Sequence, residues 1–198
     1  GLTSEEDLNE STLLSMKKRL PWLIILLFLG MGVSSVVGIF EEVVAVLPVV
    51  MCFQSLILDM AGNVGTQSLA VTIRVLMDEN LTVAQKLKLV VKEMKTGFLN
   101  GVCLAVMSFL FLGLYIHFFR KYDIGHSFLI AACVGVSLIV AMVISSLVGT
   151  VIPIFFKKIK VDPAVASGPL ITTVNDLVAV VVYYGLTWIF LINMLHIA

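Results

Sequence analysis

The chain has 198 residues, of which 60% are hydrophobic and 13% are charged, and its mean hydropathy is +1.09. A soluble domain is about half apolar and about a quarter charged, so this composition excludes an ordinary water-soluble protein. The 13 basic and 13 acidic residues cancel, and the net charge therefore gives no reason to expect a nucleic-acid partner. The three cysteines lie inside apolar runs, where we expect buried side chains rather than disulfides or a zinc site.

Five apolar runs follow an amino-terminal stretch that is first acidic and then basic. They cover residues 20–40, 43–75, 96–119, 128–156 and 167–196. Each run is long enough to cross the ~30 Å hydrocarbon core of a bilayer as a helix. The second run is too long for one straight span, and Pro48, Gly62 and Gly65 give it places to bend or to approach another backbone closely.

The basic residues between the runs predict the orientation. With five spans and the amino terminus in the cytosol, only Arg120 and Lys121 of the 13 basic residues lie outside, and the other eleven lie in the cytosol. This asymmetry follows the positive-inside rule and predicts an external carboxyl terminus. The sequence thus predicts an all-α membrane protein of the cell membrane with five transmembrane helices in each protomer.

Two acidic residues lie deep inside apolar runs, Asp59 in the second and Asp176 in the fifth. A carboxylate at the centre of a membrane helix costs roughly 2.5–3.5 kcal/mol, so it is a functional candidate by default. A buried structural aspartate would need a basic partner, but no basic residue occurs in the interior of any run. A bound cation explains the two carboxylates better.

The residues around each aspartate are rich in oxygen. Asp59, Asn63 and Gln67 recur at every fourth position and predict a polar stripe on one helix, beside the small Gly62 and Gly65. The alternative for Asn63 and Gln67 is that they only hold helices together. In the fifth run, Thr172 and Thr173 precede Asp176 by one turn, and their hydroxyls can bond back into the helix and turn carbonyls toward a lumen.

The small number of carboxylates favours Mg²⁺ as the ion. Ca²⁺ takes six to eight oxygen ligands, commonly several carboxylates, whereas Mg²⁺ keeps most of its water and needs only one or two. Soft metals are disfavoured because no cysteine and histidine share a plausible site.

Three motifs, in the same order as in a known family, occur within roughly residues 16–195. They are KKRLPWL at 17–23, DMAGNVGTQS at 59–68 with Arg74 after it, and GPLITT at 168–173 with Asp176 after it. With these motifs the sequence resembles the transmembrane domain of the MgtE family of Mg²⁺ channels and transporters.

The resemblance implies a homodimer whose pore is lined by the second and fifth helices of both protomers. Asp176 matches the family's essential Mg²⁺-binding aspartate, and Asn63 with the backbone of Gly62 and Gly65 matches its pore-lining helix. The resemblance also implies a cytosolic regulatory region with CBS domains, which these residues do not contain. We therefore expect residues 1–19 to be a cytosolic segment at the end of a truncated connecting region, and 20–198 to form the pore domain.

Two other functions fit the same residues. The chain could be a secondary transporter that uses Asp176 as a proton or Na⁺ relay. It could also be a non-conducting membrane subunit whose polar stripe mediates assembly. An enzyme is not expected, because the sequence offers no visible pair of nucleophile and base.

Overall fold

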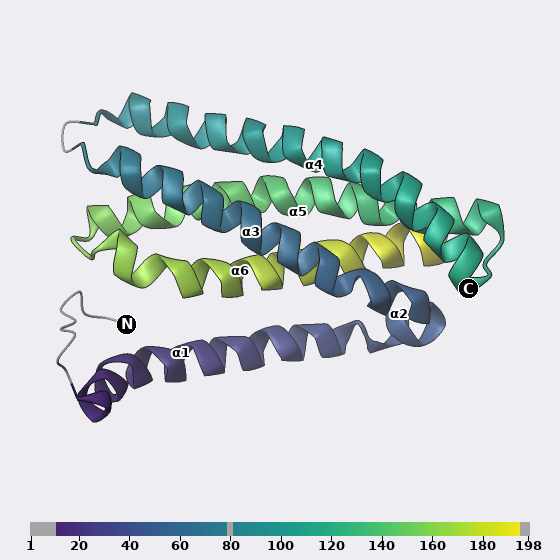
Figure 1. Ribbon diagram of the computed structural model, residues 1–198, viewed down its shortest axis with the longest axis horizontal. Coiled ribbons are helices and arrows are strands. Elements are labelled where there is room, and N and C mark those ends of the chain that lie inside the picture. Colours follow the sequence, from purple (N-terminus) through teal and green to yellow (C-terminus); the bar gives the residue numbers. More distant parts are fainter. Residues whose placement is uncertain (1–10, 79–80, 195–198) are drawn as a thin grey trace.

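The computed structural model describes residues 11–78 and 81–194, and every regular element in these two ranges is helical. Five of the helices are long and apolar enough to cross a membrane. Figure 1 shows them as an antiparallel bundle in which successive long helices run in opposite directions. The start of the first helix and the end of the last one therefore lie at opposite ends of the bundle, as five crossings require.

Helix α1 (Thr12–Ile39) is the most peripheral part of this bundle. It begins eight residues before the predicted apolar run, continues through Pro21, and contributes no buried residue. Figure 1 shows that it lies along one side of the bundle, beside α6. The boundary expected after residue 19 falls inside this helix, while residues 1–10 of the expected amino-terminal segment lie outside the described residues.

The second apolar run bends at its proline. A short helix α2 (Glu41–Val46) is followed by the 3₁₀ turn η1 (Pro48–Val50) and then by the long helix α3 (Met51–Leu76). Proline has no N–H to continue the helical ladder, so the break at Pro48 agrees with its chemistry, whereas α1 continues through Pro21. Gly62 and Gly65 leave α3 unbroken, because a glycine inside a helix weakens it without removing a backbone hydrogen bond.

Helices α4 (Val83–Arg120) and α5 (Ile124–Lys158) form a tightly packed pair. A capping box starts α4, in which the Gln85 N–H donates to the Thr82 hydroxyl and the Thr82 N–H donates to the Gln85 side chain. Glycines let the two helices approach, since a Cβ atom added to Gly101 would lie 2.9 Å from the Cα atom of Ile139. Larger residues at such positions would separate the backbones.

Helix α6 (Pro163–Leu186) continues into a π-helical segment η2 (Thr187–Met194) and packs against α1, α3 and α5. Two buried tyrosines join its second half to the start of α3. The Tyr183 hydroxyl donates to the Val50 carbonyl over 2.8 Å, and the Tyr184 hydroxyl donates to the Gln54 side-chain oxygen over 2.5 Å. These bonds satisfy the phenol groups within an otherwise apolar core.

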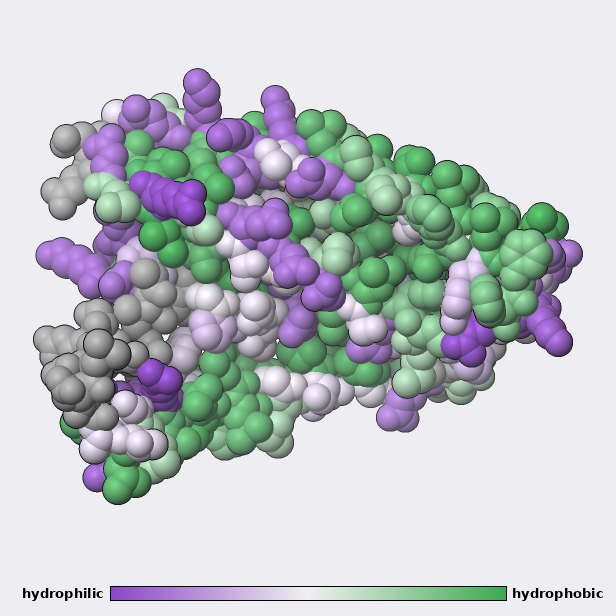
Figure 2. Space-filling model, viewed as in Figure 1, coloured by the Kyte–Doolittle hydropathy of each residue, from purple (hydrophilic) through white to green (hydrophobic). Residues whose placement is uncertain are grey.

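The surface of the bundle is that of a membrane protein. Many leucine, isoleucine and phenylalanine side chains are exposed along α1 and α4. Figure 2 shows hydrophobic residues over much of one face, with hydrophilic residues at its two ends and in a strip that extends from one end into the middle. Such an apolar band would be costly in water but matches the acyl chains of a bilayer. The predicted all-α fold, with five helices long and apolar enough to span a membrane, is therefore confirmed for the described residues.

Candidate ion-binding site

The candidate site is an open hollow of about 250 Å³ between α3 and α6. Both helices supply polar residues to it, and only one of the lining side chains is purely apolar. The lining residues are Leu58, Asp59, Gly62, Asn63, Thr66, Thr172 and Asp176. Five of the eight residues predicted from the sequence thus meet in one place, although α3 and α6 are far apart in the chain.

The two carboxylates of this hollow differ in their exposure. Asp59 is exposed, and Asp176 is half-buried. Within the described residues neither carboxylate forms an ion pair with a basic side chain. Two carboxylates without a basic partner among the described residues favour a cation between these two helices.

Hydroxyl groups next to the carboxylates bond back into their own helices. The Thr172 and Thr173 hydroxyls both donate to the Pro169 carbonyl, over 2.9 and 3.0 Å, and the Thr66 hydroxyl donates to the Asn63 carbonyl over 2.9 Å. Each hydroxyl proton is therefore committed to a carbonyl, and the oxygen lone pairs stay available to a cation or its water. Thr173 makes its bond on α6 without lining the hollow.

The two predicted glycines of α3 have different surroundings. Gly62 lines the hollow, and a Cβ atom added there would meet nothing within 4 Å, so its backbone is accessible. A Cβ atom added to Gly65 would instead meet the Asn175 side-chain amide and would lie 3.3 Å from the Ile171 Cγ2 atom. Gly65 is the point where α6 crosses α3 in close contact.

Asn175 is a residue that the sequence analysis did not single out. Its side chain is fully buried, and its amide nitrogen donates to the Ala61 carbonyl over 3.4 Å, next to Gly65. Because Asn175 precedes Asp176, this contact fixes the helical position from which the carboxylate projects. A polar residue inside an apolar run was the signal available in the sequence.

Gln67, the third member of the predicted stripe, lies in a different hollow of about 310 Å³ between α3, α4 and α5. A step of four residues overshoots one helical turn by about 40°, so Gln67 is rotated by about 80° from Asp59. In this second hollow the Ser68 hydroxyl donates over 3.0 Å to the carboxylate of Glu93, which is 6% exposed.

Glu93 also escaped the sequence analysis, because it lies in the charged stretch that precedes the third apolar run. Its neighbours one turn away on either side, Leu89 and Gly97, are buried as well. This i−4, i, i+4 pattern was the signal that Glu93 faces the bundle rather than water.

The chemistry of the α3–α6 hollow suits a hard, hydrated cation. Its polar groups are carboxylate, amide and hydroxyl oxygens, together with accessible backbone at Gly62. No group of three or more histidine, cysteine or acidic side chains comes together in the described residues. A soft-metal site needs such a cluster, whereas Mg²⁺ in its water shell needs only one or two carboxylates.

The profile of the MgtE family, described as a divalent cation transporter, matches residues 54–186. This range contains every residue that lines the α3–α6 hollow. The chain belongs to the MgtE family. Together with its five candidate spans, this membership makes it a multi-pass protein of the cell membrane, in a family of transporters rather than enzymes.

Curated relatives of this MgtE-family chain are proteins named magnesium transporter MgtE. The protein of Bacillus subtilis strain 168 is 37% identical over 178 residues, which cover 88% of this chain and 37% of the relative. The Enterococcus faecalis protein is 35% identical over 94% of this chain and 39% of its own length. The Thermus thermophilus protein is 34% identical over 83% of this chain and 34% of its own length. The chain therefore spans little more than a third of the length of these relatives.

Proposed function

We propose that this MgtE-family domain conducts Mg²⁺ across the membrane and that the α3–α6 hollow recognises the ion. The observation that carries the proposal is the meeting of Asp59 and Asp176 in one hollow between two membrane-spanning helices, without a basic partner among the described residues. The relatives named magnesium transporter support the choice of ion. Mg²⁺ is the cargo here and not a resident cofactor.

Each residue of the site has a proposed role that follows from its position. Asp176 is the principal contact for Mg²⁺ or for its water, and Asn63, Gly62 and Thr172 add neutral oxygens around it. Asp59 lies one turn before Asn63 and acts as an outer recruiting charge. The remaining predicted residues, Gly65, Thr173 and Gln67, support the pathway helices rather than line this hollow.

We propose a homodimer with its two-fold axis along the pore. One bundle has too few polar residues to enclose a pathway, and its hollow is open on one side. A second copy related by two-fold symmetry would close the hollow and bring two Asp176 carboxylates to face one cation. Helix α1 contributes no buried residue to its own bundle, which leaves a whole apolar helix for contact with lipid or with the partner.

The proposed direction of transport is into the cytosol. Eleven of the 13 basic residues fall on the side that holds the start of α1 in a five-span topology, and this side is the cytosol by the positive-inside rule. A membrane potential of 100 mV then favours the entry of a divalent cation by about 4.6 kcal/mol. No second substrate is needed as a driving force. A cytosolic CBS-type region, which the family resemblance implies, would regulate this pathway.

Flux into liposomes tests the function directly. Purified wild-type protein should admit Mg²⁺ at a rate that rises with an inside-negative K⁺ diffusion potential and that persists when pH and Na⁺ gradients are collapsed. Asp123→Asn is a matched control, because the Asp123 side chain caps α5 at the Gly125 N–H and does not line the hollow. Mg²⁺ flux that stops when the pH and Na⁺ gradients are collapsed would identify a secondary transporter coupled to protons or Na⁺. A folded wild-type protein without Mg²⁺ flux would contradict the proposal and favour the non-conducting subunit.

A further inference from the structure

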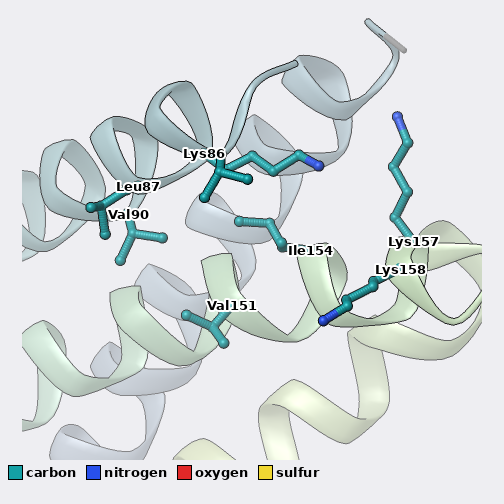
Figure 3. A pocket seen from close by; sticks show the side chains of 8 residues that line it. Lys86, Leu87, Val90, Val151, Ile154, Lys157 and Lys158 are labelled. Atoms are coloured by element: carbon teal, nitrogen blue, oxygen red, sulfur yellow. The ribbon is translucent and has the colours of Figure 1, made fainter. Parts of the chain in front are cut away.

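A third hollow, of about 600 Å³, lies between the first turns of α4 and the last turns of α5, away from the candidate ion pathway. Figure 3 shows five apolar and three basic residues around it. They are Val83, Leu87, Val90, Val151 and Ile154, with Lys86, Lys157 and Lys158. Among the described residues no acidic side chain lines the hollow, so the charge of this lining is positive.

The three lysines are not equivalent. The Lys157 ammonium donates to the backbone carbonyls of Leu76 and Asp78, and it thereby satisfies the carbonyl end of α3. Lys86 and Lys158 have no such bond among the described residues, and neither forms an ion pair there. In Figure 3 their ammonium groups lie on either side of Ile154, one from each helix.

The floor of the hollow is apolar and accessible. Leu87 is 63% exposed and Val151 is 43% exposed, although both lie next to lysines. An apolar floor below two ammonium groups that lack an ion pair within the described residues is complementary to a molecule with a negatively charged head and a hydrophobic tail. The volume falls within the roughly 300–1,000 Å³ that is typical of small-molecule sites.

The register of α4 against α5 places this hollow at the edge of the bilayer. Gly113 of α4 lies against Phe128, where the apolar run of α5 begins. Val151 follows Phe128 by 23 residues, which is about 35 Å of helix at 1.5 Å per residue. With Phe128 taken as the outer edge of a hydrocarbon core ~30 Å thick and α5 along the membrane normal, Val151 falls beyond the inner edge, at the level of the lipid headgroups.

We propose that this hollow binds an anionic phospholipid. The lipid phosphate lies between Lys86 and Lys158, and the first carbons of an acyl chain cover Leu87, Val151 and Ile154. Basic pockets between transmembrane helices at a headgroup level recognise lipids in this way. The proposal does not depend on ion transport, because none of the residues that line the α3–α6 hollow takes part.

The first test compares two lipids on purified protein in neutral detergent, with the thermal unfolding midpoint and native mass spectrometry as measurements. Phosphatidylglycerol should raise the midpoint and remain bound to the protein, while phosphatidylcholine should do neither. In the double variant Lys86→Gln/Lys158→Gln, the apparent affinity for phosphatidylglycerol should fall by about 30-fold, since each lysine near an anionic lipid contributes about 1 kcal/mol. The control Lys88→Gln/Lys95→Gln removes the same charge from exposed positions of α4 outside the hollow and should bind normally.

A second variant tests the floor. Val151→Trp fills the hollow without changing its charge and should weaken phosphatidylglycerol binding by at least about tenfold. Equal binding of the two lipids, or equal losses in the Lys86/Lys158 and Lys88/Lys95 variants, would overturn the proposal. So would inorganic phosphate that stabilises the protein as strongly as phosphatidylglycerol, because the site would then recognise the anion alone.

Discussion

The two polar hollows on either side of α3 contain similar side chains but are built in opposite ways. The α3–α6 hollow presents two carboxylates that are exposed or half-buried, and no basic residue lines it. The hollow between α3, α4 and α5 holds one carboxylate, Glu93, which is 6% exposed, is bonded to Ser68, and has Lys92 among the lining residues.

This difference separates a carboxylate that can meet an ion from one that holds helices together. A charge that stays accessible and unpaired keeps its attraction for a cation from outside. A carboxylate that accepts a hydrogen bond inside the bundle stabilises the packing of the helices, and its attraction for a cation from outside is weaker. One helix, α3, serves both purposes because its opposite faces look toward different neighbours.

The largest effect should come from Asp176→Asn. This change removes the charge and keeps the shape, so Mg²⁺ influx into liposomes should fall at least about tenfold, which equals about 1.4 kcal/mol. The thermal unfolding midpoint should stay close to that of the wild type, because the carboxylate has no ion-pair partner to lose within the described residues. Wild-type influx in this variant would remove Asp176 from the mechanism.

The next effect concerns the crossing of α3 and α6. In Gly65→Ala the new methyl group meets the Asn175 amide, and overpacking of this kind costs about 1–3 kcal/mol of stability. Influx should fall as well, because Asp176 follows Asn175 on the displaced helix. Adding Asn175→Ala should recover part of both losses, and a double-mutant cycle measures the coupling. Simple additivity of the two changes would mean that the contact does not position the site.

A smaller change is expected for Asp59→Asn. In its proposed role as an outer recruiting charge, Asp59 would raise the local cation concentration without stripping the water of Mg²⁺. The Mg²⁺ concentration for half-maximal influx should therefore rise about three- to tenfold, and block by cobalt hexammine should weaken, while saturating influx persists. Complete loss of transport would instead identify Asp59 as a direct ligand.

The smallest effect on flux should come from Glu93→Gln. The amide can still accept the Ser68 hydrogen bond, so we expect influx within about twofold of the wild type and a stability loss of about 1 kcal/mol. Ser68→Ala should lower the unfolding midpoint by a similar amount, and the double variant should lose less than the sum. A fall in influx as large as that of Asp176→Asn would show that the ion passes through the second hollow.

Sequence patterns predicted the spans well because membrane depth leaves few alternatives. An apolar run of this length at membrane depth must be a helix, so the five crossings were predictable, and Pro48 marked one place where the second run could bend. Helix α1 begins at Thr12, before the apolar run that starts at residue 20, because a helix can continue past its apolar run through Lys17 and Arg19. The apolar run alone does not show where the backbone hydrogen bonds of the helix begin.

The site was predictable in its members and less so in its geometry. Asp59 and Asp176 could be singled out from the sequence because they are acidic residues deep inside apolar runs. The structure brings both into one hollow. The four-residue spacing of Asp59, Asn63 and Gln67 did not predict that Gln67 faces α4. The surroundings of Gln67 depend on which helix packs on each face of α3. Asn175 and Glu93 acquire their surroundings only through contacts with other helices. The roles of all these residues in metal binding stay predictions.

The polar faces of α3 also have a consequence for how the protein is made. Of the five spans, α3 is the least apolar, and Asp59, Asn63 and Gln67 face partners that come later in the chain. From the end of α3 at Leu76, 100 residues must be synthesised before Asp176 emerges, which takes about 5–20 s at cellular elongation rates. During this interval the face of α3 that carries Asp59 and Asn63 lacks α6 and must be accommodated by the insertion machinery, by lipid or by an earlier helix. Biogenesis therefore limits how polar α3 can be, in addition to the demands of the finished fold.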